Sequence, residues 1–170
     1  MNSETTLVLG GARSGKSAFA ESLALKSKFK PVYLATGRAL DDEMVSRIEA
    51  HQSRRGDQWE TIEEPLALVD AINQSAYGER IVLVDCLTMW ITNLMMAEAH
   101  VEREISSLAK FLKDAPVPVV MVSNETGQGV TPDNRMAREF VDLSGNAHQA
   151  IAAVCNNVYF VTAGIPQKLK

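Results

Sequence analysis

The stretch Leu7–Ser17, LVLGGARSGKS, decides the fold of this chain. It runs from an apolar, strand-like segment into a glycine-rich turn that ends in Lys16 and Ser17. Gly10 and Gly15 bracket four residues and Lys-Ser follows, which completes the phosphate-binding pattern GxxxxGK[ST]. The backbone N–H groups of such a turn must curl around a polyphosphate, so residues without a Cβ are needed where the chain folds back.

An amphipathic helix is predicted directly after this turn, and its positive amino end would point at the same anion. Lys16 can reach the outer phosphates as a catalytic residue, and the Ser17 hydroxyl can bind Mg²⁺. The alternative is a glycine-rich turn with an incidental lysine, but the flanking strand and helix patterns favour a nucleotide site. Its predicted binding residues are Gly10, Gly11, Ala12, Arg13, Ser14, Gly15, Lys16 and Ser17.

The composition is that of a globular chain. Its 170 residues, 46% hydrophobic and 22% charged, are most simply one domain over 1–170 with a proper core. A net charge of −4 offers no large basic field, so nucleic acid is not an expected partner. The polar start, MNSETT, shows no secretory signal, and the two cysteines lack metal-ligand spacing. We therefore expect a cytoplasmic protein.

The most apolar window, residues 81–97, contains Asp85, Thr88, Thr92 and Asn93. It predicts a buried strand followed by a helix rather than a membrane span.

Short apolar segments alternate with helical patterns along the chain. Strands are predicted at Thr5–Leu9, Pro31–Ala35, Ile81–Val84, Pro118–Ser123 and Val158–Thr162, with Trp59–Ile62 as a weaker edge strand. Helices are predicted at Lys16–Ser27, Asp42–Arg54, Leu66–Gln74, Val101–Lys113 and Asp133–Val154. This alternation predicts an α/β fold with a mostly parallel sheet and helices on both faces.

Ligands of such sheets collect at the carboxyl ends of the strands. Asp85 ends an apolar strand. In proteins with a phosphate-binding loop, a carboxylate at such a strand end holds Mg²⁺, so this role is predicted for Asp85. The alternative is that Asp85 caps the next helix. The turn Ala35–Gly37 is equally compatible with ligand contact and with a simple loop. The loop Asn124–Gly129 follows a central strand and should line the same cleft.

His51 falls on the apolar stripe of the helix predicted at Asp42–Arg54, with Arg54 and Arg55 close behind. It is either a packed histidine or a nucleophile that attacks phosphorus, with the arginines holding phosphate oxygens. Spacing alone does not decide between them. His100 is predicted to lie on the surface and His148 to be structural.

These residues resemble the bifunctional adenosylcobinamide kinase/adenosylcobinamide-phosphate guanylyltransferases of cobalamin biosynthesis. The resemblance covers nearly the whole chain in order and includes the final GIPQKLK. Its motifs are GGARSGKS at Gly10–Ser17, YLATGRALDDEMVSRIEAHQSRR at Tyr33–Arg55, WETIEEP at Trp59–Pro65, VDCLTMWITN at Val84–Asn93 and SNETGQGVTPDNRMAREFVDLSG at Ser123–Gly145. The chain departs from the family pattern at Gly56, at Val141 and at residues 147–149.

The resemblance implies a RecA-like P-loop NTPase domain, a corrinoid substrate, GTP and ATP as nucleotide substrates, Mg²⁺ on Ser17 and Asp85, and a homotrimer. It implies phosphorylation of adenosylcobinamide, then transfer of GMP from GTP through guanylylated His51. It also implies nucleotide contacts at Ala35, Thr36, Gly37, Gln52, Ser53, Arg54, Arg55, Glu63 and Asp85. The alternatives are a monofunctional small-molecule P-loop kinase with a structural His51, or a non-catalytic nucleotide switch.

Overall fold

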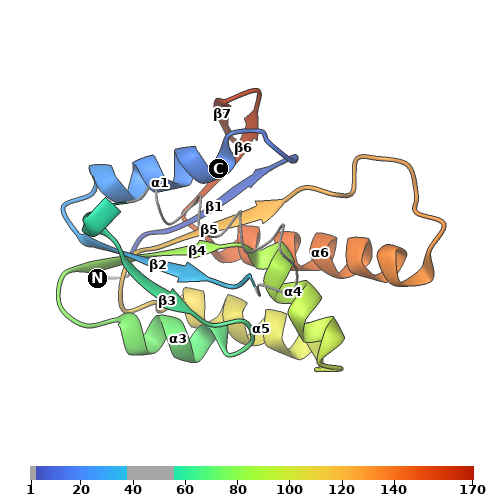
Figure 1. Ribbon diagram of the computed structural model, residues 1–170, viewed down its shortest axis with the longest axis horizontal. Helices are drawn as coiled ribbons and strands as arrows, with labels where there is room; N and C mark the ends of the chain where they lie inside the picture. The colour runs from blue at the N-terminus through green and yellow to red at the C-terminus, as the bar shows by residue number, and fades with distance from the viewer. Residues whose placement is uncertain (1–2, 38–55) are drawn as a thin grey trace.

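The computed structural model describes residues 3–37 and 56–170 of the chain. The seven strands found there form one sheet, in the order β3-β2-β4-β5-β1-β6-β7 (Figure 1). Neighbouring strands are parallel except for β6 and β7, which are antiparallel. The strands are β1 (Thr5–Gly10), β2 (Lys30–Ala35), β3 (Glu60–Glu63), β4 (Arg80–Asp85), β5 (Val119–Asn124), β6 (Asn157–Thr162) and β7 (Ile165–Lys168).

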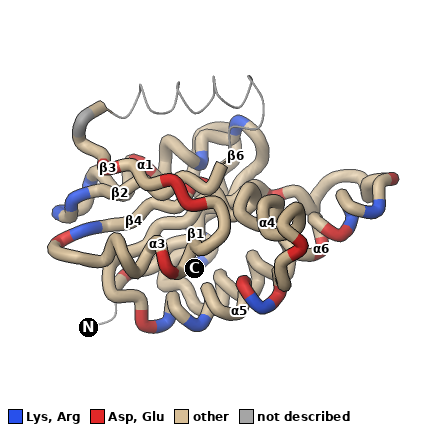
Figure 2. Tube along the Cα trace, turned by 60° about the horizontal axis from the view of Figure 1, so that its bottom comes forward, with Lys and Arg blue, Asp and Glu red and all other residues tan. Residues whose placement is uncertain are grey.

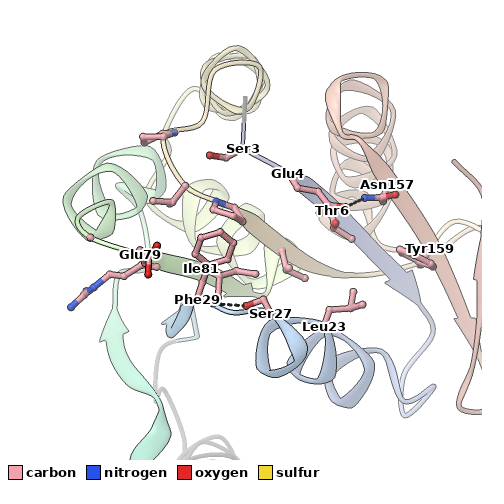
Figure 3. Close-up of a pocket in the computed structure, with 16 residues that line it drawn as sticks. Ser3, Glu4, Thr6, Leu23, Ser27, Phe29, Glu79, Ile81, Asn157 and Tyr159 are labelled. Atoms are coloured by element: carbon pink, nitrogen blue, oxygen red, sulfur yellow. Dashed lines mark hydrogen bonds between the residues drawn. The ribbon is translucent and has the colours of Figure 1, made fainter. Parts of the chain in front are cut away.

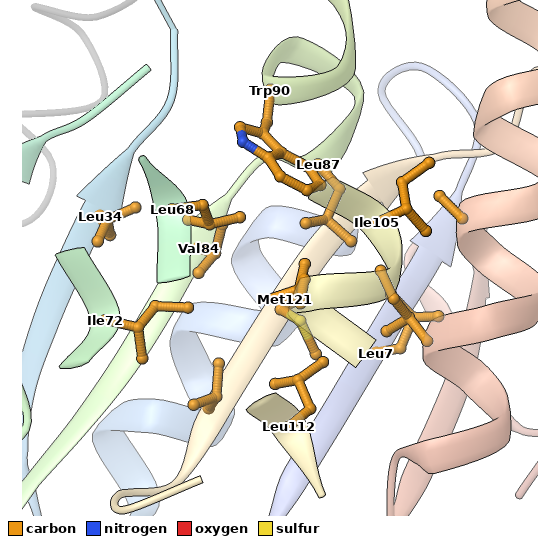
Figure 4. Close-up of a cluster of buried hydrophobic side chains, with 14 of the residues drawn as sticks. Leu7, Leu34, Leu68, Ile72, Val84, Leu87, Trp90, Ile105, Leu112 and Met121 are labelled. Carbon is orange, nitrogen blue, oxygen red and sulfur yellow. The ribbon is translucent and has the colours of Figure 1, made fainter. Parts of the chain in front are cut away.

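Helices cover both faces of the sheet, with α1 on one side and α3 to α6 on the other (Figure 1). The larger core lies under the second group, where Trp90 and Leu68 meet Leu7 and Met121 of the central strands (Figure 4). The helices are α1 (Lys16–Lys26), α3 (Leu68–Ser75), α4 (Leu87–Met96), α5 (Val101–Leu112) and α6 (Arg135–Val154), with a 3-10 turn η1 (Gly56–Gln58) before β3. The outer side of α5 carries charges of both signs (Figure 2).

The sequence of β1 explains its central position. Each of its six residues is buried, and successive side chains point to opposite faces of the sheet. Leu7 and Leu9 pack under α3 to α6, whereas Val8 packs with Ala20 and Ala24 of α1. A strand that is apolar on both faces suits the middle of a doubly covered parallel sheet.

The predicted α/β fold, with a mostly parallel sheet and helices on both faces, is confirmed. The predicted strands and helices within the described residues begin and end within two residues of the observed bounds. The edge strand β3 and the helix α4 that was expected after β4 are both present. The helix predicted at residues 42–54 lies outside the described residues, and β7 was not predicted. No helix in the described part of the chain is long and apolar enough to cross a membrane.

Candidate active site

The pairing of the parallel strands aligns several predicted site residues along one edge of the sheet. Ala35 at the end of β2 pairs with Glu63 of β3 and with Asp85 of β4. Gly10 at the end of β1 pairs with Asn124 of β5, which lies between β1 and β4. The strand ends that sequence reasoning selected therefore meet at the carboxyl edge.

Two glycines of the loop between β1 and α1 are required by their surroundings. A Cβ on Gly10 would lie 2.6 Å from the Val161 carbonyl oxygen and 2.5 Å from Ser14 Oγ. Gly15 has a φ of 94°, a conformation that favours glycine. The loop can therefore fold back tightly and enter α1 only with glycine at these positions.

The amino end of α1 presents backbone donors at this loop. The first helical bond runs from the Phe19 N–H to the Gly15 carbonyl at 3.0 Å, so the N–H groups of residues 16–18 precede the helical ladder. No side chain of the described residues caps this end. Lys16 Nζ donates to the Gly11 carbonyl at 3.2 Å, which holds the ammonium over the loop. This arrangement is suited to an anion.

The β6–β7 hairpin supports the loop from the side. The Gly164 N–H donates to the Ser14 carbonyl at 2.7 Å, and an added Cβ on Gly15 would lie 3.1 Å from Gly164 Cα. Ala163 and Gly164 form the two-residue turn, with φ values of 52° and 80°. Sequence reasoning missed this support. The hairpin itself had a signal, a glycine in a two-residue connection between apolar segments, but its contact with the loop had none.

Asp85, at the end of β4, is held by a neighbouring strand. Tyr33 of β2 donates its hydroxyl hydrogen to Asp85 Oδ2 at 3.0 Å, and the Tyr33 ring packs edge-on against Trp59. Burial, and after it the Asp85 charge, raise the pKa of the adjacent Cys86 thiol to about 11, against the lowering effect of the thiol's hydrogen bonds and of the Lys16 ammonium. Asp85 pairs with Val122 of β5 and Gly10 pairs with Asn124, so Asp85 lies at the same edge of the sheet as the loop that carries Lys16.

Thr36 ties the segment after β2 to the segment after β4. Its fully buried hydroxyl donates to the Cys86 carbonyl at 2.7 Å and accepts from the Cys86 N–H at 2.9 Å. Its carbonyl accepts from the Asn93 side-chain amide at 2.7 Å. The hydroxyl of Thr36 is thus committed to positioning this segment, whereas Ala35 and Gly37 on either side are only half-buried.

The loop after β5 reaches the phosphate-binding loop, as its sequence position predicted. The Glu125 N–H donates to the Gly10 carbonyl at 2.9 Å. Ser123 Oγ lies 2.8 Å from Nε2 of His148, which is buried on α6 and has the structural environment expected of it. Sequence reasoning gave Glu125 and Ser123 no role, since a buried partner on a distant helix leaves no local pattern.

The residues at this edge fit a magnesium ion. Asp85 and Ser17 supply a carboxylate and a hydroxyl, the hard oxygen ligands that Mg²⁺ prefers. In the described part of the chain, His, Cys, Asp and Glu side chains do not gather in threes around a possible metal position. Mg²⁺ is commonly held by one or two protein groups together with substrate phosphates and water, so a carboxylate and a hydroxyl would be enough to bind it here.

Five of the predicted site residues lie outside the described residues, whereas Ala12 and Arg13 lie in the described loop between β1 and α1. Those five are His51, Gln52, Ser53, Arg54 and Arg55. Glu63 lies at the end of β3 with an exposed side chain.

The fold and the residues at the carboxyl edge of the sheet define the class of protein. It has a P-loop NTPase fold with the phosphate-binding loop at that edge. A solved protein of Pyrococcus horikoshii OT3 shares the fold, with a TM-score of 0.56 and 12% identity over 100% of this chain and 88% of that one. The chain belongs to the family described as cobinamide kinase / cobinamide phosphate guanyltransferase, whose sequence model matches residues 6–169. The family is one of transferases, and the resemblance drawn from the motifs is confirmed.

Curated relatives span nearly the same length. The bifunctional adenosylcobalamin biosynthesis protein CobP of Pseudomonas aeruginosa is 46% identical over 166 residues, which are 96% of each chain. The corresponding protein CobU of Escherichia coli K12 is 38% identical over 179 residues, 96% of this chain and 98% of the relative.

Proposed function

We propose that this protein phosphorylates adenosylcobinamide with a nucleoside triphosphate and then transfers GMP from GTP to the new phosphate through His51. The observation that carries the proposal is the meeting of Lys16, the open amino end of α1 and Asp85 at one sheet edge. Membership of the cobinamide kinase / cobinamide phosphate guanyltransferase family supports both activities.

The kinase step needs positioning and charge stabilisation. The hydroxyl oxygen of the corrinoid attacks the γ-phosphorus as the bond to the leaving nucleoside diphosphate breaks. Lys16 and the N–H groups at the start of α1 stabilise the charge on the transferring group. Ser17 and Asp85 would hold Mg²⁺, which neutralises phosphate charge when bound. The hydrogen bond from Tyr33 keeps the Asp85 carboxylate oriented.

The transferase step acts on the α-phosphorus instead. A neutral His51 imidazole nitrogen attacks it, pyrophosphate leaves, and a phosphoramidate to GMP forms. A phosphate oxygen of the corrinoid then displaces His51, which regenerates the imidazole and gives adenosylcobinamide-GDP. Gln52, Ser53, Arg54 and Arg55 would bind the nucleotide beside His51, together with Ala35, Thr36, Gly37 and Glu63. By the same resemblance, we propose a homotrimer, which light scattering would report as about three times the 18.6 kDa of one chain.

Labelling tests the role of His51. The wild type, His51→Ala and His100→Ala are each incubated with GTP labelled at the α-phosphate. His100→Ala is the matched control, because His100 is an exposed histidine at the start of α5. We expect acid-labile protein label in the wild type and the control but none in His51→Ala, which should retain cobinamide phosphorylation at least in part. Undiminished labelling of His51→Ala would contradict the proposal.

A further inference from the structure

Glu125 is a carboxylate beside the phosphate-binding loop that the mechanism above leaves without a role. It is the first residue after β5, and its N–H is bonded to the Gly10 carbonyl at 2.9 Å. Because β5 lies between β1 and β4, Glu125 leaves the sheet between the strand that carries the loop and the strand that ends in Asp85. A group at this point borders the place where the γ-phosphate is expected.

The carboxylate of Glu125 is held from two sides. Its Oε1 accepts the N–H of Gly127, and its Oε2 lies 3.9 Å from Nδ1 of His148. The Glu125 side chain is 21% exposed, whereas the His148 side chain is only 9% exposed. The carboxylate is therefore held in position and is only partly accessible to solvent.

His148 is suited to orient that carboxylate. Burial lowers the pKa of His148 below its ordinary value of 6.5, an effect that the Glu125 charge opposes, so the ring is neutral at pH 7. A neutral imidazole carries one N–H. With that hydrogen on Nδ1, the ring presents a donor toward Glu125, while Nε2 accepts from the Ser123 hydroxyl 2.8 Å away. A carboxylate that faces a neutral donor still has free lone pairs that can accept a proton.

We propose that Glu125 is the proton acceptor of the kinase step and that His148 is its positioning residue. This inference rests on the proposed function. As the corrinoid oxygen bonds to the γ-phosphorus and the bond to the nucleoside diphosphate breaks, the hydroxyl proton passes to the Glu125 carboxylate, which later releases it to water. Transfer of GMP needs no such acceptor, because the attacking group is a phosphate oxygen that carries no proton at neutral pH. The kinase step therefore depends on Glu125, whereas the transfer of GMP does not.

The test compares Glu125→Gln with Glu102→Gln, a matched change on the exposed side of α5. Glutamine keeps an oxygen for the Gly127 N–H but is a far weaker base. We expect kcat for cobinamide phosphorylation to fall about 100-fold in Glu125→Gln. Nucleotide affinity and GMP transfer to supplied cobinamide phosphate should match those of the wild type and of Glu102→Gln.

Two results would overturn the role of Glu125. One is phosphorylation by Glu125→Gln at the wild-type rate. The other is an equal loss of phosphorylation, GMP transfer and nucleotide affinity, which would mean that Glu125 only supports the loop. A wild type that does not phosphorylate cobinamide would instead overturn the proposed function, and this inference with it.

A pair of variants tests His148. His148→Gln places an amide near the position of Nε2 and keeps a partner for Ser123, whereas His148→Asn places an amide near the position of Nδ1 and keeps a donor toward Glu125. If His148 acts through Glu125, His148→Gln lowers the kinase kcat more than His148→Asn and leaves KM for the nucleotide unchanged. Equal kcat values in the two variants, or an effect confined to KM, would contradict the positioning role.

Discussion

The two edges of the sheet differ in how their polar groups are used. The amino edge has a cavity of about 460 Å³ among Leu23, Phe29, Ile81 and Tyr159 (Figure 3). Several polar groups around this cavity are already paired, among them Ser27, Asn157 and Arg80. Arg80 binds both carboxylate oxygens of Glu60, at 3.2 and 2.6 Å, and stacks on the Tyr77 ring.

At the carboxyl edge, the polar groups face the predicted nucleotide position rather than one another. The first turn of α1 has no side-chain cap in the described residues, and Lys16 rests on a loop carbonyl that it can leave. Asp85 accepts a hydrogen bond from the buried Tyr33, and Glu125 accepts the Gly127 N–H with the buried His148 ring 3.9 Å from its other oxygen. A ligand at this edge can bind without breaking a strong ion pair. The candidate active site is therefore marked by the placement of its polar groups rather than by the size of a cavity.

The largest expected effect follows from removing the loop ammonium. Lys16→Met should lower the kinase kcat by about 100- to 1000-fold, because a preorganised donor to the transferring phosphoryl group is lost. Lys26→Met is the matched control at the exposed end of α1. Phosphorylation of cobinamide under saturating nucleotide is the measurement, and a Lys16→Met rate like that of the control would remove Lys16 from catalysis.

Gly10→Ala should damage both stability and nucleotide binding. The added Cβ would lie 2.6 Å from the backbone oxygen of Val161, so the strand end must move. We expect a loss of about 1–3 kcal/mol in the free energy of unfolding. Gly129→Ala is the control, since a Cβ there meets open space. Urea titrations with equal midpoints for the two variants would mean that the loop tolerates a side chain at Gly10.

Arg80→Met tests the amino edge and should separate stability from activity. Loss of the bidentate pair with Glu60 should cost about 2 kcal/mol of unfolding free energy. Kinase kcat and KM for the nucleotide should stay at wild-type values, because Arg80 lies at the start of β4, away from Asp85 at its end. Arg103→Met, an exposed change on α5, is the control. A selective rise in nucleotide KM would break the contrast between the two edges.

The smallest effect concerns pH and His148. Burial lowers the folded-state pKa of His148 below 6.5, so the unfolded chain binds a proton that the folded protein resists. The stability that this residue contributes is fully present above pH 6.5 and is lost as the pH falls from there through the lower folded-state value. Urea titrations across this range should show a shallower decline for His148→Gln. Identical pH dependence in the wild type and this variant would contradict the explanation.

Much of this fold was predictable because its signals are local. The run Leu7–Ser17 contains a strand, a turn and a helix start, and apolar runs such as Ile81–Val84 mark buried strands. Parallel pairing then brings Gly10 and Asp85 to one edge without further information.

The unpredicted features depend on contacts between distant parts of the chain. The hairpin turn at Gly164 matters because it bonds to Ser14, and no pattern near Gly164 reveals that. Likewise, His148 on α6 contacts Ser123 on β5, and the Thr36 hydroxyl is hydrogen-bonded to the Cys86 backbone. Such partners are set by packing in three dimensions. The predicted role of His51 stays a prediction, since residues 38–55 lie outside the described part.

The central claim is the proposal that one chain carries out both reactions. The most direct measurement is turnover of adenosylcobinamide with GTP, with the corrinoid products resolved by chromatography over time. We predict that adenosylcobinamide phosphate rises first and is then converted to adenosylcobinamide-GDP with release of pyrophosphate. Accumulation of the phosphate alone, or consumption of GTP without either corrinoid product, would contradict the claim.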